Sequence, residues 1–119
     1  MPRNSLNYPK RGEIFIADLN PAFGREIHKK RPILIISRNL LNQTLPTVVM
    51  IPLSSIVPEF VGPDVVKIKD PKIGLVRDSA LIVNQIRSID KSRLVKKAGK
   101  LNQIKMEEVE QALKVVLDL

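Results

Sequence analysis

An arginine held in place by the proline after it is the residue of this sequence best suited to chemistry on an anion. Pro32 has a fixed φ and disfavours helical backbone for the residue before it, so Arg31 is expected to be extended. A guanidinium keeps its positive charge in proteins and presents a fork of donors that fits phosphate oxygens. His28, Lys29 and Lys30 precede Arg31, so the segment indicates an anion-binding edge. The simpler alternative for Arg31 taken alone is a surface ion pair.

A serine provides the second candidate group. Residues 47–53 are mostly apolar and β-branched, which predicts a core strand, with Pro52 near its end where a ladder donor is least needed. Ser54 follows directly, so the strand would hold its hydroxyl rigidly at the surface. The simpler alternative for Ser54 is a cap at the end of the strand.

Residue counts and motifs exclude several other kinds of site. The chain has no cysteine and one histidine, which rules out cysteine redox or zinc sites and histidine-rich metal sites. We find no Ser/His/Asp set, phosphate loop, GxGxxG or zinc pattern. No acidic cluster has the spacing of a known calcium loop. We therefore expect no metal and no cofactor.

The charge balance favours a polyanionic partner. Twenty Lys and Arg residues stand against twelve Asp and Glu, for a net charge of +8 and a pI near 10.1. The excess is shared, with eight basic against four acidic side chains in residues 1–60 and twelve against eight in 61–119. Such a surface attracts nucleic acid first, although many small proteins are basic without binding it. Aromatic residues make up 3%, so few side chains could stack on bases.

The elements that must position these groups are short strands and one helix. The length of 119 residues suits one compact domain, expected over residues 1–119. Apolar alternation and β-branched runs predict about six strands, in residues 12–19, 33–37, 47–53, 65–69, 80–89 with a kink near Asn84, and within 91–100 after a short turn. Apolar residues at three- and four-residue spacing after Asn102 predict a C-terminal helix that Asn102 caps. We expect a small, strongly bent and mainly antiparallel sheet or barrel.

One connection is long for a compact domain. Residues 20–31 give about a dozen positions between two predicted strands, and connections of this length are usually functional or disordered. Phe23 lies inside it, either packed into the core or beside a ligand.

Nothing in the sequence predicts a membrane span or a signal peptide. No apolar run is long enough to cross a bilayer, and residues 1–11 are polar with no apolar centre. We therefore expect a cytoplasmic protein.

A series of short motifs resembles one known family. In order, they are Arg11-Gly12-Glu13-Ile14, Asp18-Leu19-Asn20-Pro21, Gly24-Arg25-Glu26, Arg31-Pro32-Ile33, Leu45-Pro46-Thr47, Ile51-Pro52-Leu53-Ser54, Arg77-Asp78-Ser79, Gln85-Ile86-Arg87-Ser88-Ile89-Asp90 and Leu94. Each motif alone is weak, but their order and spacing resemble the PemK/MazF toxins over nearly the whole chain.

The resemblance implies a fold, an activity and partners. The fold would be mainly β, an SH3-like small barrel of six to seven strands with a C-terminal helix. The activity would be that of an mRNA interferase, a metal-independent and sequence-specific endoribonuclease for single-stranded RNA. The working unit would be a homodimer with RNA across its interface. A cognate acidic antitoxin would neutralise the toxin and bind DNA together with it.

The resemblance also assigns the catalytic pair. The family's catalytic arginine corresponds to Arg31 and its catalytic threonine to Ser54, which keeps the hydroxyl but lacks the methyl group that restricts χ1. The family's acidic residue before the Gln-Ile-Arg motif is Asn84 here. Some members have an Arg/Asp pair in that segment, where this chain has Ile82 and Asn84. The chain therefore follows the arginine-plus-hydroxyl version.

RNA supplies its own nucleophile for this reaction. The 2′-OH attacks the adjacent phosphate and leaves a 2′,3′-cyclic phosphate and a 5′-OH. The enzyme needs only to align the attack and stabilise the charge that develops. Arg31 would bind the phosphorane oxygens and Ser54 would donate one hydrogen bond.

Loop residues are the candidates for binding and reading the RNA. Amides and carboxylates read the edges of single-stranded bases, which favours Glu26, Asn84 and Gln85. Basic side chains would hold the backbone and an aromatic ring would stack. These candidates are Lys29, Lys30, Arg38 and Phe23.

Two other functions remain open on the same barrel. A gyrase-poisoning toxin would need determinants for its partner near its C-terminus, where Leu117-Asp118-Leu119 has no aromatic or basic anchor. A nucleic-acid-binding barrel that does not cleave is the second alternative, and the Ser54 and Asn84 departures are compatible with it.

Overall fold

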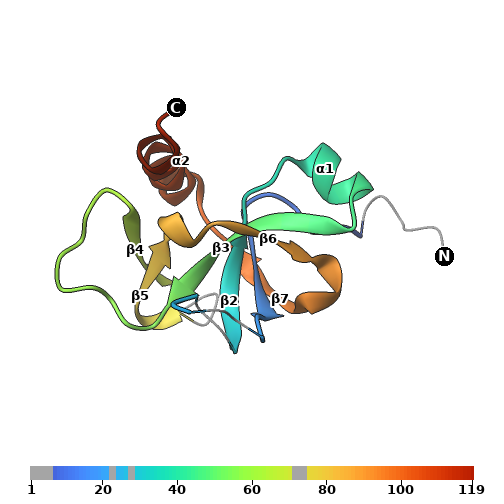
Figure 1. Cartoon of the computed structure of the whole chain (residues 1–119), viewed down its shortest axis with the longest axis horizontal. Coiled ribbons are helices and arrows are strands. Elements are labelled where there is room, and N and C mark those ends of the chain that lie inside the picture. Colours follow the sequence, from blue (N-terminus) through green and yellow to red (C-terminus); the bar gives the residue numbers. More distant parts are fainter. Residues whose placement is uncertain (1–6, 22–23, 27–28, 71–74) are drawn as a thin grey trace.

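The computed structural model describes residues 7–21, 24–26, 29–70 and 75–119. Figure 1 shows a bent sheet with α2 over one side and α1 at the other end. The elements are β1 (Glu13–Asp18), β2 (Lys30–Ile35), α1 (Asn39–Thr44), β3 (Thr47–Ser54), β4 (Val65–Asp70), β5 (Leu75–Ile82), η2 (Val83–Gln85), β6 (Arg87–Asp90), η3 (Lys91–Arg93), β7 (Leu94–Lys100) and α2 (Gln103–Leu117).

The described strands form one antiparallel sheet. Its strand order is β4-β5-β3-β2-β1-β7, and β6 pairs with the first half of β3. β3 therefore has β2 along one edge, and β6 followed by β5 along the other. This central position explains the continuous apolar run in residues 47–53, because both faces of β3 are covered.

Two apolar clusters lie on opposite faces of the sheet, as alternation along a strand requires. The larger one includes Ile14, Leu34 and Ile51 and extends to the buried side chains of α2. The second is formed by Ala17, Leu19, Ile33, Ile35, Val48, Met50 and Ile89.

The C-terminal helix begins where the sequence predicts. The Oδ1 atom of Asn102 accepts a hydrogen bond from the backbone N–H of Lys105 at 2.8 Å, which caps the helix. Met106, Val109 and Ala112 are its buried residues, on the predicted apolar stripe. The helix packs this stripe against η2 and β4.

The predicted fold class, a mainly β, SH3-like small barrel of six to seven strands with a C-terminal helix, is confirmed. The kink near Asn84 is the short helix η2, which separates β5 from β6. The short turn and final strand predicted in residues 91–100 are confirmed: Asp90 caps the η3 turn, and β7 begins directly after it at Leu94.

Candidate functional site

Arg31 and Ser54 lie just beyond the same end of the β2–β3 ladder. β2 and β3 pair antiparallel, and the last pair at this end is Ile33 with Pro52. Arg31 lies two residues before Ile33 and Ser54 two residues after Pro52, so the antiparallel register would bring them to facing positions if it continued. Both residues are half-buried. The fold thus carries to one end of this ladder two candidates that lie 23 positions apart in the sequence.

Small residues flank this pair on both sides. Arg31 pairs with Ala17 of β1, and Ser54 pairs with Ala80 of β5. Both alanines are fully buried. Because an alanine projects only a methyl group, the guanidinium and the hydroxyl are the groups of this row that can reach a ligand.

The hydroxyl of Ser54 is oriented by the backbone that follows it. Its Oγ accepts a hydrogen bond from the N–H of Ile56 at 3.1 Å. The strand-end cap foreseen for Ser54 is therefore present, but it uses only a lone pair. The hydroxyl proton is available to donate to an oxygen of a ligand.

The connection between β1 and β2 is fixed at its base. The N–H of Leu19 donates to the carbonyl of Lys29, and the N–H of Lys29 donates to Oδ1 of Asn20, both at 3.0 Å. The Nη1 atom of Arg93 donates to the carbonyls of Asp18, at 3.1 Å, and Asn20. Lys29 itself has a left-handed backbone with a φ of 68°, a conformation that only such external contacts sustain in a residue with a Cβ.

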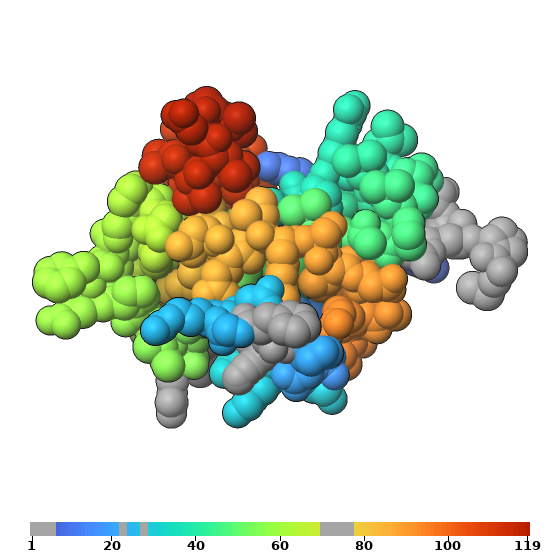
Figure 2. Space-filling view, viewed as in Figure 1, coloured from blue at the N-terminus to red at the C-terminus, as the bar shows by residue number. Residues whose placement is uncertain are grey.

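A hollow separates this connection from the sheet. We call it the loop hollow; it has a volume of about 350 Å³ and is lined by Arg25, Glu26, Asn84, Gln85, Ile86 and Arg87. Figure 2 shows the segment 24–26 in blue against the yellow and orange surface of η2 and β6. All three predicted base-reading residues therefore lie around one concavity.

Two polar contacts join the walls of the loop hollow. Arg87 Nη1 lies 3.0 Å from Glu26 Oε2, with side-chain exposures of 25% and 38%. Gln85 Nε2 donates to the carbonyl of Arg25 at 3.4 Å. Both contacts run from η2 and β6 to the loop, so the sheet determines where the loop side chains lie.

The remaining predicted residues are dispersed. Lys29 and Lys30 are exposed at the start of β2, beside Arg31. Arg38 is exposed beyond the opposite end of β2, just before α1. Phe23 and His28 lie outside the residues that the structure describes.

Sequence reasoning missed three arginines of this region. Arg25 and Arg87 line the loop hollow, and Arg93 holds the base of the loop. Arg87 belongs to the Gln-Ile-Arg motif, but its glutamate partner lies 61 positions away. Only the fold could reveal that pair.

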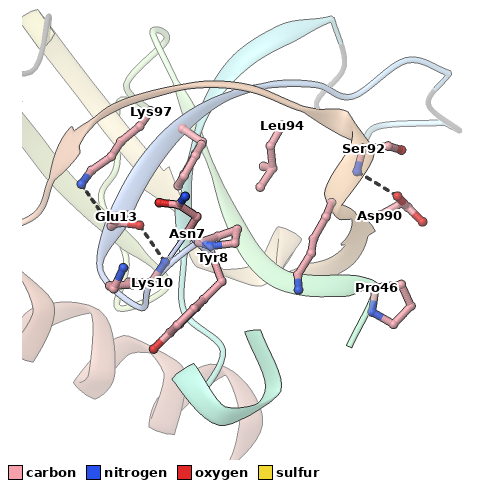
Figure 3. Close-up of a pocket in the computed structure, with 12 residues that line it drawn as sticks. Asn7, Tyr8, Lys10, Glu13, Pro46, Asp90, Ser92, Leu94 and Lys97 are labelled. Atoms are coloured by element: carbon pink, nitrogen blue, oxygen red, sulfur yellow. Dashed lines mark hydrogen bonds and ion pairs between the residues drawn. The ribbon is translucent and has the colours of Figure 1, made fainter. Parts of the chain in front are cut away.

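A larger hollow of about 590 Å³, the seam hollow, opens between the N-terminal segment, β1, β7 and the turn at η3. Its lining includes Tyr8, Lys10, Glu13, Asp90 and Lys97. Figure 3 shows Glu13 between Lys10 and Lys97, bonded to the N–H of the former at 2.7 Å and to the ammonium of the latter. Among the residues that the structure describes, none of those predicted to act on RNA lines it.

One carboxylate of the seam hollow has a shifted pKa. The N–H of Ser92 donates to Asp90 at 2.8 Å. This bond, the Ser92 hydroxyl and the positive charge of Arg93 lower the pKa of the Asp90 carboxyl below its ordinary value.

Neither a metal-binding cluster nor a membrane-spanning helix is found among the described residues. In that part of the chain, no three His, Asp or Glu side chains gather in a way that could hold a metal ion. No helix there has both the length and the apolar character that crossing a membrane requires.

The sequence is similar to that of a known protein over almost its whole length. The Endoribonuclease EndoA of Bacillus subtilis is 36% identical over 110 residues, which covers 92% of this chain and 95% of that protein.

Solved structures match the fold. MazF of Deinococcus radiodurans superposes with a TM-score of 0.81 at 21% identity, over 94% of this chain and 98% of that one. A mycobacterial endoribonuclease in complex with its cognate antitoxin gives a TM-score of 0.76 at 22% identity, over 93% and 96%.

A family model described as "PemK-like, MazF-like toxin of type II toxin-antitoxin system" matches residues 10–117. This range includes the motifs of the sequence, Arg31 and Ser54, and the residues of the loop hollow. The chain belongs to the PemK/MazF family of toxins.

Proposed function

We propose that this protein is an endoribonuclease toxin that cuts single-stranded mRNA at specific sequences without a metal ion. The observation that supports the proposal is the β2–β3 register, which ends with Ile33 opposite Pro52 and so leaves Arg31 and Ser54 at the same end of the ladder. The identity to Endoribonuclease EndoA over nearly the whole chain supports the same reaction class.

The reaction that fits these two groups is an internal transesterification. The 2′-oxygen bonds to the phosphorus, the bond from phosphorus to the 5′-oxygen breaks, and the products are a 2′,3′-cyclic phosphate and a 5′-OH. The 2′-OH loses its proton and the 5′-oxygen gains one. Arg31 stabilises the negative charge on the non-bridging oxygens, and the hydroxyl of Ser54 donates a hydrogen bond to one of them.

Base reading is assigned to the loop hollow. Glu26 offers carboxylate acceptors, and Asn84 and Gln85 offer amides that both donate and accept. Lys29 and Lys30 lie beside Arg31, where they would bind the flanking phosphates. Phe23 remains the candidate for stacking, and Arg38 would contact only RNA that extends along β2.

We also propose that the protein works as a homodimer and is neutralised by an acidic antitoxin. Structural neighbours include an endoribonuclease with its cognate antitoxin and MazE-MazF of Deinococcus radiodurans. The net charge of +8 suits an acidic peptide. Ile56 and Phe60, 79% and 86% exposed, offer apolar contacts to a second chain. An mRNA substrate places this activity in the cytoplasm.

The test is cleavage of a labelled, unstructured RNA pool by the purified protein in EDTA, with sequencing of the cut sites and analysis of the new ends. We expect recurrent cut sites, cyclic phosphate ends that only acid or a phosphatase for cyclic ends removes, and free 5′-OH groups. Retention of RNA without any cut would favour a non-cleaving barrel. Inhibition of gyrase with intact RNA would favour the gyrase-poisoning alternative.

A further inference from the structure

Arg87 occupies a rigid position beside the loop hollow. It pairs with Met50 of the central strand β3 and lies on the same face of β6 as the buried Ile89. Its side chain is 25% exposed and reaches across to Glu26. A strand in the middle of the fold therefore sets the position of a side chain on the loop.

The charge of Glu26 needs a partner at this place. An ionised carboxylate beside a phosphodiester chain would repel it, and the guanidinium of Arg87 at 3.0 Å offsets that charge. A carboxylate held in this way still accepts hydrogen bonds, because each of its oxygens has two acceptor positions.

A fixed carboxylate discriminates among bases by their donors. The exocyclic amino groups of adenine, cytosine and guanine can donate to it, whereas the one edge donor of uracil, its N3–H, lies between two carbonyl oxygens that repel a carboxylate. Precision at such a site requires that the reading group be held by its supporting residues, since a loop alone holds it loosely.

We propose that Arg87 is a positioning residue that fixes Glu26 as the acceptor for one amino-bearing base, and so disfavours uracil at that nucleotide of the cut site. The inference rests on the proposed function. It assigns Arg87 an effect on base preference through Glu26 and no contact with the reacting phosphate.

The experiment measures kcat and KM for a short RNA that carries the mapped cut site. The same constants are measured for variants of this RNA in which each flanking position in turn carries each of the other bases. Arg87→Ala and Glu26→Ala should lower the preference over uracil roughly tenfold at the same single nucleotide, the size expected for loss of one base contact. For the preferred RNA, KM should rise while kcat changes by less than about threefold, because uniform binding is lost and the chemical step is not.

The double variant shows whether Arg87 acts through Glu26. With Glu26→Ala already present, Arg87→Ala should change the preference no further, as expected for two residues that act as one unit. Arg87→Lys, which keeps a cation near Glu26, should retain most of the preference. An additive double variant would overturn the inference.

Arg11→Ala is the matched control. Arg11 makes the same kind of ion pair, to Glu110 at 3.1 Å with exposures of 36% and 42%, so this change removes an equal charge from another part of the surface. It should leave the base preference unchanged. Thermal melting of each variant confirms that it is folded, and Arg87→Gln, which removes the charge but keeps a side chain of similar length, provides the test if Arg87→Ala is not.

Other outcomes are equally decisive. A loss of cleavage in Arg87→Ala that is uniform across sequences would mean that Arg87 binds phosphate, which contradicts the inference. A fall in kcat alone would place Arg87 in the chemical step and would also contradict it. If the unaltered protein cuts no RNA, the proposed function is contradicted. If the unaltered protein cuts RNA and Arg87→Ala has the same base preference, only this inference is contradicted.

Discussion

Two glutamate–cation pairs show how this small barrel separates stability from function. Glu13 lies in the sheet, its side chain 8% exposed, and pairs with Lys97 of the adjacent strand β7. Glu26 lies on the loop, 38% exposed, and pairs with Arg87 of β6. The first pair joins elements that already share backbone hydrogen bonds, and the second joins elements that do not.

The difference in burial decides what each pair contributes. Exposed ion pairs add about 0–1 kcal/mol to stability, so the Glu26 pair contributes little to folding, and the role proposed for it is to position a reading group. Glu13 also accepts the N–H of Lys10 and keeps the N-terminal segment on the barrel. We therefore expect changes around the seam hollow to affect melting, and changes around Arg31 and the loop hollow to affect catalysis.

Among changes in the two regions, Arg31→Ala is expected to have the largest effect, on the cleavage rate. Loss of a donor that stabilises transition-state charge typically costs roughly 10²–10³ in rate, and the loss of a full charge beside the phosphate should cost at least that. The fold should survive, because Arg31 is half-buried at the start of β2. Single-turnover cleavage and thermal melting check the two halves of this prediction. Cleavage at the normal rate would remove Arg31 from the mechanism.

Glu13→Ala should lower stability and leave the cleavage rate unchanged, the opposite of Arg31→Ala. It removes a buried hydrogen bond and its ion pair, which should cost about 1–3 kcal/mol in the free energy of unfolding and lower Tm by roughly 3–12 °C. The cleavage rate below the melting range should be unchanged. Glu13→Gln, which can still accept from the N–H of Lys10, should cost less. A stable Glu13→Ala variant with impaired cleavage would contradict the claim that the seam hollow serves stability and the loop hollow serves catalysis.

Ser54 allows a finer test of the catalytic region. Ser54→Ala removes the hydroxyl and should lower the single-turnover rate by roughly 10- to 100-fold, less than Arg31→Ala, because a neutral donor stabilises charge less than a cation does. Ser54→Thr keeps the hydroxyl and adds a methyl group that restricts χ1, so it should be at least as active as the natural protein. If Ser54→Thr were as slow as Ser54→Ala, the hydroxyl could not be the contributing group.

The smallest effect is expected at Asp90, in the seam hollow. Its pKa is lowered in the folded protein, so its charge stabilises the fold above the unfolded pKa of about 3.9 and that contribution is lost as pH falls further. Asp90→Asn can still accept from Ser92 but carries no charge. The difference in urea midpoint between the two proteins should be small at pH 7 and shrink below about pH 4. A difference that grows in acid would contradict the assigned hydrogen bond.

Local patterns were sufficient to predict most of the fold. The apolar run in 47–53 predicts a central strand because both of its faces must be covered, and Asn102 marks the start of α2 because its side chain caps the first turn. A short turn before the last strand was also predicted, and the Asp90 cap on η3 explains why β7 begins at Leu94.

The site was predictable only in part, because its contacts are long-range. Ser54 and Arg31 were predicted from their places at strand ends and from the resemblance, and the register of β2 with β3 puts both at the same end of that ladder. The Glu26–Arg87 pair was not, because opposite charges 61 positions apart meet only through the topology of β3 and β6. Sequence thus locates groups at strand ends better than it locates partners across the sheet.

The most direct test of the central claim is cleavage of one mapped RNA with and without the 2′-OH at the cut site. The account predicts that a single 2′-deoxy nucleotide there abolishes cleavage in EDTA, while the same change one nucleotide away does not, because the 2′-oxygen is the nucleophile that Arg31 and Ser54 assist. Cutting of the deoxy-substituted RNA at the same bond would contradict it.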